Sequence, residues 1–257
     1  MARTQDARTV TLGGREINRI GLGTNRLTDT DAHQSFLKEA VDAGLHFIDT
    51  AHVYTDGESE QTIGAALAPF SDDLVVATKA GYTGTELPEL RLQVEQSFER
   101  LRTDRITLYY LHRVHPQIPI EESVGVLAEF VDAGRIEHVG LSEVSVEQIT
   151  RAQAVTPIAA VQNEFNLRER KWDRVIDHCE AEGMVFVPFF PLRADSDAVA
   201  QVAERHGATA GQVKLAWLLA RSPNVAPIPG TLSIGHLKEN LQTLDLELSD
   251  EDLAALG

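Results

Sequence analysis

Hydrophobic and polar positions follow two alternating periods along the chain. Short apolar runs of strand length occupy residues 20–24, 45–49, 74–79, 106–112, 138–142, 159–163, 185–190 and 225–229. Between them, apolar residues recur three and four positions apart, the spacing of one helix face, in residues 31–43, 60–68, 89–101, 120–133, 146–154, 171–181 and 198–220. The last stretch is interrupted near His206 and Gly207, which predicts two helices, and residues 236–241 and 249–256 predict two closing helices.

Eight strands that alternate with helices predict an α/β protein with a parallel sheet. Eight such units close into a (β/α)₈ TIM barrel, whose usual size is about 250 residues. The chain has 257 residues, so we expect residues 1–257 to form a single barrel domain.

Two short apolar stretches precede the first predicted barrel strand. Residues 9–12 and 16–20 flank Gly13 and Gly14. Paired glycines between two such stretches are typical of a tight hairpin turn. The sequence therefore predicts an N-terminal β-hairpin ahead of the barrel.

Polar residues stand where the predicted strands end. Asp49, Lys79 and His112 end three strands, and Tyr54 lies five residues after Asp49. In a parallel barrel all strands end on one face, where the active site of such proteins lies. Other strand ends carry Thr24, Ser142, Gln162 with Asn163, Phe189 with Phe190, and Gly230. Burying polar groups there is costly without a use, so this face is the predicted active site.

The order and placement of Asp49, Tyr54, Lys79 and His112 resemble the catalytic tetrad of the aldo-keto reductases. The resemblance extends from about Thr9 to the end of the chain, and residues 111–116, 140–144 and 161–167 are most similar to the pyridoxal reductase branch. It implies a barrel whose bottom is closed by the hairpin. It also implies NADPH-dependent reduction of aldehydes and ketones to alcohols, with pyridoxal as a candidate substrate.

The chemistry of carbonyl reduction accounts for these four residue types. Hydride transfer to a carbonyl carbon requires an acid near the oxygen, and a tyrosine with a pKa of about 10 is poorly matched to neutral pH. A nearby ammonium lowers that pKa, and a carboxylate keeps the ammonium charged and in place. We therefore assign Tyr54 as proton donor, Lys79 as the group that tunes it and Asp49 as the partner of Lys79. His112 would hydrogen-bond and orient the carbonyl oxygen.

The same resemblance implies a set of cofactor-binding residues. Ser142 and Gln162 would hold the nicotinamide carboxamide, Phe189 would stack on the ring, and Leu192 would follow the pyrophosphate. Residues 228–240 resemble the segment that binds the adenosine phosphate and adenine, where backbone amides lead into a helix. The full predicted set is Thr24, Asp49, Ser142, Gln162, Phe189, Leu192, Gly230, Thr231, His236, Glu239 and Asn240.

Several of these positions differ from many members of the family. Gly230 replaces a lysine, His236 an arginine, Leu232 a hydroxyl residue and Glu143 an asparagine. Fewer charge-assisted contacts to a 2′-phosphate follow. NADP(H) is the predicted cofactor, and NAD(H) remains the alternative.

Composition limits the classes of partner. A net charge of −16 and a pI near 4.9 argue against binding of nucleic acid or anionic membranes. Cys179 is the single cysteine and fits a reducing cytoplasm. The N-terminus lacks the apolar segment of a signal peptide. We expect a cytoplasmic protein, monomeric or weakly homo-oligomeric, that acts on small carbonyl compounds.

Two other functions compete with this hypothesis. A cofactor-binding regulatory or redox-sensing subunit on the same fold predicts tight cofactor binding, very slow turnover and a stable partner complex. A metal-dependent hydrolase would use His52, His112 and His115, but no carboxylate stands at a matched position. That alternative also leaves Lys79 and Tyr54 without a role, so we predict no metal site.

Overall fold

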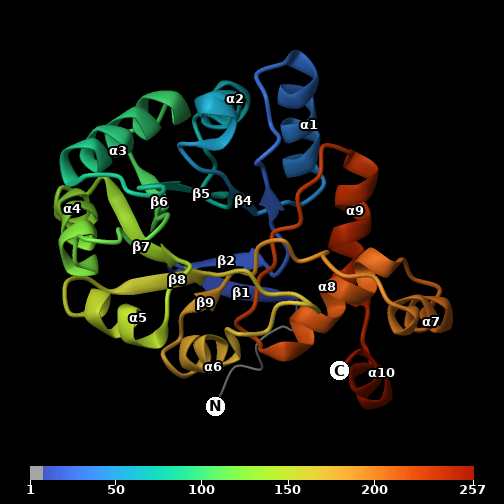
Figure 1. Cartoon of the computed structure of the whole chain (residues 1–257). Coiled ribbons are helices and arrows are strands. Elements are labelled where there is room, and N and C mark those ends of the chain that lie inside the picture. Colours follow the sequence, from blue (N-terminus) through green and yellow to red (C-terminus); the bar gives the residue numbers. More distant parts are fainter. Residues whose placement is uncertain (1–7) are drawn as a thin grey trace, which may run out of the picture.

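The computed structural model describes residues 8–257 and contains a seven-stranded parallel sheet. Each strand pairs with the next one along the chain, and the sheet curls into a barrel with helices around its outside (Figure 1). In sheet order the strands are β3 (Leu22–Gly23), β4 (Phe47–Asp49), β5 (Val75–Ala80), β6 (Ile106–Leu111), β7 (Ile136–Ser142), β8 (Ile158–Gln162) and β9 (Val185–Phe186).

Helices follow the strands as the periodicity predicted. They are α1 (Asp31–Asp42), α2 (Glu58–Leu67), α3 (Leu87–Leu101), α4 (Ile120–Asp132), α5 (Val146–Gln153), α6 (Asp173–Ala181), α7 (Asp197–His206), α8 (Ala210–Arg221), α9 (Ile234–Gln242) and α10 (Asp250–Leu256), with short 3₁₀ turns η1 (Tyr54–Gly57) and η2 (Thr243–Asp245). The predicted break is confirmed, because Gly207 ends α7 in the left-handed region at φ 59°. Thr209 then caps α8 by accepting a hydrogen bond from the Gln212 amide.

The predicted eighth strand, residues 225–229, is not a regular strand. Pro227 and Pro229 have no backbone N–H, so they cannot donate to a ladder. The segment nevertheless closes the barrel between β9 and β3 through carbonyl acceptors and single bridges. Its hydrogen bonds include Gly21 N to Pro227 O (3.0 Å), Gly23 N to Pro229 O (3.4 Å) and Ala226 N to Phe186 O (2.9 Å). The (β/α)₈ barrel is confirmed, with one seam built from this segment.

The N-terminal hairpin is confirmed as β1 (Thr9–Leu12) paired antiparallel with β2 (Arg15–Asn18). Gly13 and Gly14 form its turn at φ 57° and 78°, where a side chain is disfavoured. Apolar residues of the hairpin pack into the barrel interior with residues from β4, β5 and β6. This packing covers one end of the barrel and leaves the other end for the site.

The strands bury both of their faces. Phe47, Val75 and Tyr110 belong to the cluster inside the barrel. The residues next to them in sequence, Ile48, Val76 and Tyr109, belong to the cluster that packs against the helices. Such burial on both sides explains why the strands read as continuous apolar runs. Outside β8, Phe165 is 1 % exposed and stacks on Trp217 at 5.7 Å between ring centroids.

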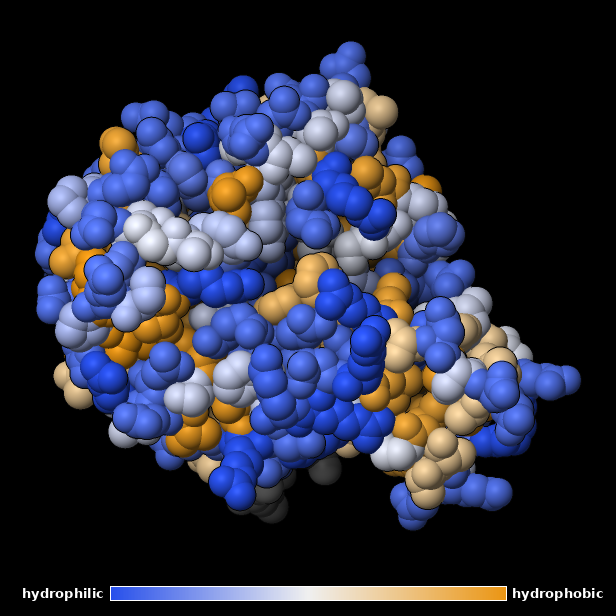
Figure 2. Space-filling model, viewed as in Figure 1, coloured by the Kyte–Doolittle hydropathy of each residue, from blue (hydrophilic) through white to orange (hydrophobic). Residues whose placement is uncertain are grey.

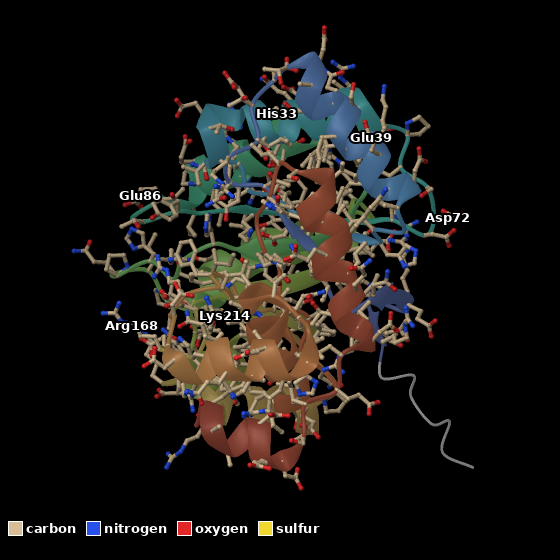
Figure 3. All side chains as sticks on the ribbon, turned by 90° about the vertical axis from the view of Figure 1, so that its right-hand side faces the viewer. His33, Glu39, Asp72, Glu86, Arg168 and Lys214 are labelled. Atoms are coloured by element: carbon tan, nitrogen blue, oxygen red, sulfur yellow. The ribbon has the colours of Figure 1, made fainter. Side chains whose placement is uncertain are left out.

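Charged and polar side chains cover the outside of the barrel. Hydrophilic residues dominate the face seen in Figure 2, with hydrophobic residues in small scattered groups. Glu39, Asp72 and Glu86 point outward from three different parts of the ring (Figure 3). Within residues 8–257, no helix is long and apolar enough to cross a lipid bilayer.

Candidate active site

The ends of β4 and β5 bring Asp49 and Lys79 together. Lys79 Nζ donates to Asp49 Oδ1 at 2.5 Å and to the Thr50 carbonyl at 2.7 Å. The two side chains are 0 % and 1 % exposed, respectively. Gln162, at the end of β8, donates its amide to the second carboxylate oxygen of Asp49 at 2.7 Å. The predicted ion pair therefore lies in the core, and two neighbouring groups, the Thr50 carbonyl and the Gln162 amide, hold it.

Burial and hydrogen bonding act on the Asp49 carboxyl in opposite directions. Loss of water raises the pKa of Asp49 above its usual value, while the Lys79 ammonium and the Gln162 amide oppose that rise. The ionised form of this carboxylate depends on Lys79, because desolvation disfavours a buried charge that has no partner.

Tyr54 is fixed by an unusual turn directly after β4. Its amide donates to the Ala51 carbonyl at 3.0 Å, and the next three residues are left-handed: Thr55 at φ 48°, Asp56 at 54° and Gly57 at 93°. Two consecutive residues other than glycine in that region cost backbone strain. The Thr55 hydroxyl compensates in part by donating to the Leu27 carbonyl at 2.6 Å. The turn sets the direction of the Tyr54 side chain.

The Tyr54 ring lies against the other predicted catalytic residues. Lys79 Nζ is 5.0 Å from the ring centroid, and the His112 ring crosses it at 82° with 6.0 Å between centroids. Burial raises the pKa of Tyr54, and the charge of Lys79 only partly offsets it. The sequence argument identified the lowering by Lys79 but missed the larger opposing effect of burial. The phenol therefore stays protonated at neutral pH.

His112 follows β6 and is held as a neutral imidazole. Burial, and then the charges of Lys79 and Arg113, lower the pKa of His112 to about 2. Its Nδ1 atom is buried and has no hydrogen-bond partner among residues 8–257. A proton on Nδ1 would be left unsatisfied, so the proton belongs on Nε2. The Tyr82 ring packs against the imidazole, with 4.9 Å between centroids.

A cavity of about 500 Å³ opens at the carboxyl ends of the strands. Eight of the residues predicted from sequence line it: Thr24, Asp49, Tyr54, His112, Ser142, Gln162, Phe189 and Gly230. Lys79 lies outside this lining, bonded to Asp49. The four residues predicted to be catalytic therefore lie close together at the cavity. Whether these residues act in catalysis and cofactor binding stays a prediction.

The other predicted cofactor residues lie beyond the cavity lining. They are Leu192, Thr231, His236, Glu239 and Asn240, on the loop after β9, on the segment leading into α9 and on α9 itself. Ser233 caps α9 by accepting from the His236 amide, and the Ser233 amide donates to the Thr231 hydroxyl. The free amides of a helix N-terminus suit an anionic group.

Four further residues near these positions are absent from the predicted catalytic and cofactor-binding sets, although the predicted substrate-pocket loops 25–30 and 113–119 contain two of them, Arg26 and Arg113. Arg26 donates to the Gly230 carbonyl at 2.9 Å, and Lys214 on α8 (Figure 3) donates to the Leu192 carbonyl at 3.1 Å. Tyr82 and Arg113 line the cavity itself. All four lie on loops or on a helix rather than at a strand end, so the search of strand ends did not assign them a role.

The residues at the cavity fit a nicotinamide cofactor. The Ser142 hydroxyl and the Gln162 carbonyl oxygen could hold a carboxamide, which both donates and accepts hydrogen bonds. Phe189 could supply an aromatic surface for a planar ring. Arg26 offers a cationic group close to Gly230, where phosphates would run, whereas Lys214, close to Leu192, is already paired with Asp195 at 2.5 Å.

Comparison with known proteins places this geometry in a family. Residues 19–257 match the model of the aldo/keto reductase family. Pyridoxine 4-dehydrogenase of Escherichia coli is 38 % identical over 276 residues, which cover 96 % of each chain. The thermostable aldo-keto reductase Tm1743, solved with the inhibitor epalrestat, is 33 % identical with a TM-score of 0.88 over 96 % of this chain and 98 % of that one.

A second solved structure is similar over nearly the same range. The aldo/keto reductase of Klebsiella pneumoniae, in complex with NADP and acetate, is 29 % identical with a TM-score of 0.85 and covers 97 % of this chain and 94 % of its own. The match of the family model, the 38 % identical relative and the barrel agree with one another. The chain therefore belongs to the aldo/keto reductase family.

Proposed function

We propose that the protein is an NADP(H)-dependent oxidoreductase that reduces aldehydes and ketones to alcohols. The observation that carries this proposal is the cavity in which Tyr54 and His112 stand side by side, backed by the buried Asp49–Lys79 pair. Similarity to family members solved with NADP or NADPH bound supports the choice of cofactor. Pyridoxal is the proposed first substrate to test, because pyridoxine 4-dehydrogenase is a relative.

In the proposed reaction the cofactor acts on the carbonyl carbon, and the side chains of the protein act on the carbonyl oxygen. Bound NADPH supplies the hydride to the carbonyl carbon. Tyr54, protonated at neutral pH, gives its proton to the oxygen, and Lys79 stabilises the phenolate that remains. His112 donates from Nε2 to the same oxygen and remains neutral. Asp49 holds Lys79 in place.

The cofactor would lie across the mouth of the barrel. Ser142, Gln162 and Phe189 would hold the nicotinamide end. Arg26 could supply the cation that the sequence lacks at Gly230, since its guanidinium bonds to that residue. This arrangement favours NADPH over NADH, and replacing Arg26 by Gln should weaken NADPH binding more than NADH binding.

Replacement of Tyr54 by Phe tests the proposal directly. NADPH oxidation with pyridoxal and with benzaldehyde should fall by about 10² to 10⁴, the usual contribution of a general acid. Tyr82→Phe is the matched control, because it removes a second phenol from the same cavity and keeps the ring on His112. The control should lose far less activity, and both variants should bind NADPH as the wild type does.

The regulatory subunit predicts a different outcome of the same experiment. In that case the wild type would bind NADPH saturably and show negligible turnover with every aldehyde. Equal turnover of wild type and Tyr54→Phe would instead reject Tyr54 as the acid.

A further inference from the structure

The cavity carries one charged group that the proposed reaction does not use. Among its lining residues the ionisable side chains with a charge at neutral pH are Asp49 and Arg113. Asp49 is neutralised by Lys79. Within residues 8–257, Arg113 forms no ion pair with a carboxylate. In a protein with a net charge of −16, a cation in the cavity without a carboxylate partner is available for an anion from outside.

The Arg113 guanidinium is held in place by neutral groups. Its Nη1 donates to the His112 carbonyl at 2.6 Å and to the Ser142 hydroxyl at 2.9 Å. The guanidinium carbon is 5.6 Å from the centroid of the Tyr82 ring and 5.8 Å from that of Phe189. Nε and Nη2 make no hydrogen bond within the described residues. A guanidinium has five N–H donors in a planar fork that matches a carboxylate or phosphate, so this side of Arg113 is suited to such a group.

Arg113 also lies beside the two residues proposed to contact the carbonyl oxygen. Tyr82 packs on the His112 ring at 4.9 Å and on the Arg113 guanidinium at 5.6 Å, so one ring bridges the two groups. The charge of Arg113 also acts on Tyr54, where it opposes the rise in pKa caused by burial. A substrate whose carbonyl meets Tyr54 and His112 shares the cavity with the guanidinium and can therefore present a charged substituent to it.

The position of Arg113 beside Phe189 and Ser142 gives an electrostatic reason to expect a negatively charged substrate. Ser142 and Phe189, which contact Arg113, would hold a bound nicotinamide, and the cation would then oppose the positive charge that the ring would gain when it supplies hydride. A negative group on the substrate would pair with Arg113 and remove this opposition. A neutral substrate would leave it in place.

We propose that Arg113 selects carbonyl substrates that carry a negatively charged group, a carboxylate or a phosphate monoester, close to the aldehyde. The inference rests on the proposed function and goes beyond it by naming the substrate class. Arg113 acts here as a specificity-determining residue.

Matched pairs of substrates test the inference. One pair is 3-carboxybenzaldehyde and its uncharged methyl ester, and the other is pyridoxal 5′-phosphate and pyridoxal. For each pair the ratio of kcat/KM, charged over neutral, is measured in the wild type and in Arg113→Gln. A charge-assisted contact contributes about tenfold to a hundredfold, so the ratio should fall by that factor in the variant. The two pairs distinguish carboxylate from phosphate recognition.

Arg193→Gln is the matched control. Arg193 lies over the Phe190 ring at 3.8 Å, near the same mouth, but already pairs with Glu164 at 2.6 Å. Its removal should leave the ratio unchanged, whereas Arg113→Lys should retain part of it. NADPH dissociation constants, measured by quenching of tryptophan fluorescence, show whether Arg113 serves the cofactor instead.

The outcomes separate this inference from the proposed function. Turnover of neutral aldehydes that depends on Tyr54, with a ratio unaltered by Arg113→Gln, would overturn the inference alone. Loss of NADPH affinity in Arg113→Gln without a change in the ratio would also overturn it. Absence of turnover with all four substrates would reject the proposed function first.

Discussion

Replacing Lys79 by Met should destabilise the barrel in a way that depends on pH. Methionine fills much of the lysine's volume but leaves the Asp49 carboxyl buried without its cation. Both side chains are essentially inaccessible to water, and Asp49 would keep only the Gln162 amide as a polar partner. Desolvation already raises the pKa of Asp49, and without Lys79 that rise is unopposed by a charge. The carboxyl should then be protonated in the folded variant at neutral pH.

The size of the effect follows from linkage. In the unfolded chain Asp49 titrates with a pKa of about 3.9. Where the folded form holds a proton that the unfolded form has lost, stability decreases as pH rises, by about 1.4 kcal/mol per pH unit. The loss is therefore about 4 kcal/mol at pH 7 and about 1.5 kcal/mol at pH 5. The first figure agrees with the roughly 3–5 kcal/mol expected when one partner of a buried pair is removed.

Urea unfolding followed by tryptophan fluorescence measures this loss at the two pH values. The double variant Asp49→Asn with Lys79→Met is the control, because it removes the titrating carboxyl. Its loss of stability relative to the wild type should therefore be similar at pH 5 and pH 7. A loss in Lys79→Met that is equal at pH 5 and pH 7 would refute the reasoning. Wild-type stability of that variant at pH 7 would show that the pair contributes nothing.

Three further predictions concern other buried groups. His112 has a pKa of about 2 in the folded protein and about 6.5 in the unfolded chain, so below pH 6.5 only the unfolded chain binds the proton and the free energy of unfolding should fall by about 1.4 kcal/mol per pH unit. His112→Gln should reduce this decline in urea titrations, and an unchanged slope would contradict the prediction. Burial raises the pKa of the Cys179 thiol to about 12, so Ellman's reagent should react with native protein no faster than it unfolds. Phe165→Ala should lower the free energy of unfolding by about 3–5 kcal/mol, since Phe165 is buried against Trp217, and a loss below 1 kcal/mol would show that the site collapses around the change.

The strand ends were the part of the site most accessible from sequence. Asp49, Lys79 and His112 each follow an apolar run, and the barrel brings all such ends to one face, so their proximity required no knowledge of side-chain geometry. The direction of the pKa shift of Tyr54 could not be predicted, because it depends on how deeply the turn after β4 buries the ring.

Other features were harder to read for different reasons. Arg113 stands in a loop, and its orientation is decided by contacts with Ser142 and Phe189, which come from distant parts of the chain. The irregular eighth strand was visible in principle, since Pro227 and Pro229 lack the donors that a ladder requires. Residues 225–229 were predicted to form a regular strand because they are mostly apolar, despite the two prolines.

The seam at residues 225–230 has a consequence for how the barrel opens. Neighbouring strands elsewhere are joined by ladders, whereas this segment is joined to β3 and β9 by scattered single hydrogen bonds and isolated bridges. Local opening with the lowest free energy is therefore expected here, in the sense used for native-state hydrogen exchange. Gly230, in this segment, forms a bridge with Gly23, and Thr24 comes directly after Gly23, so two proposed cofactor contacts lie where the segment meets β3. A ligand that binds only the closed seam favours the closed state by mass action. A cofactor that binds more tightly should therefore lower the rate of hydrogen exchange at the seam.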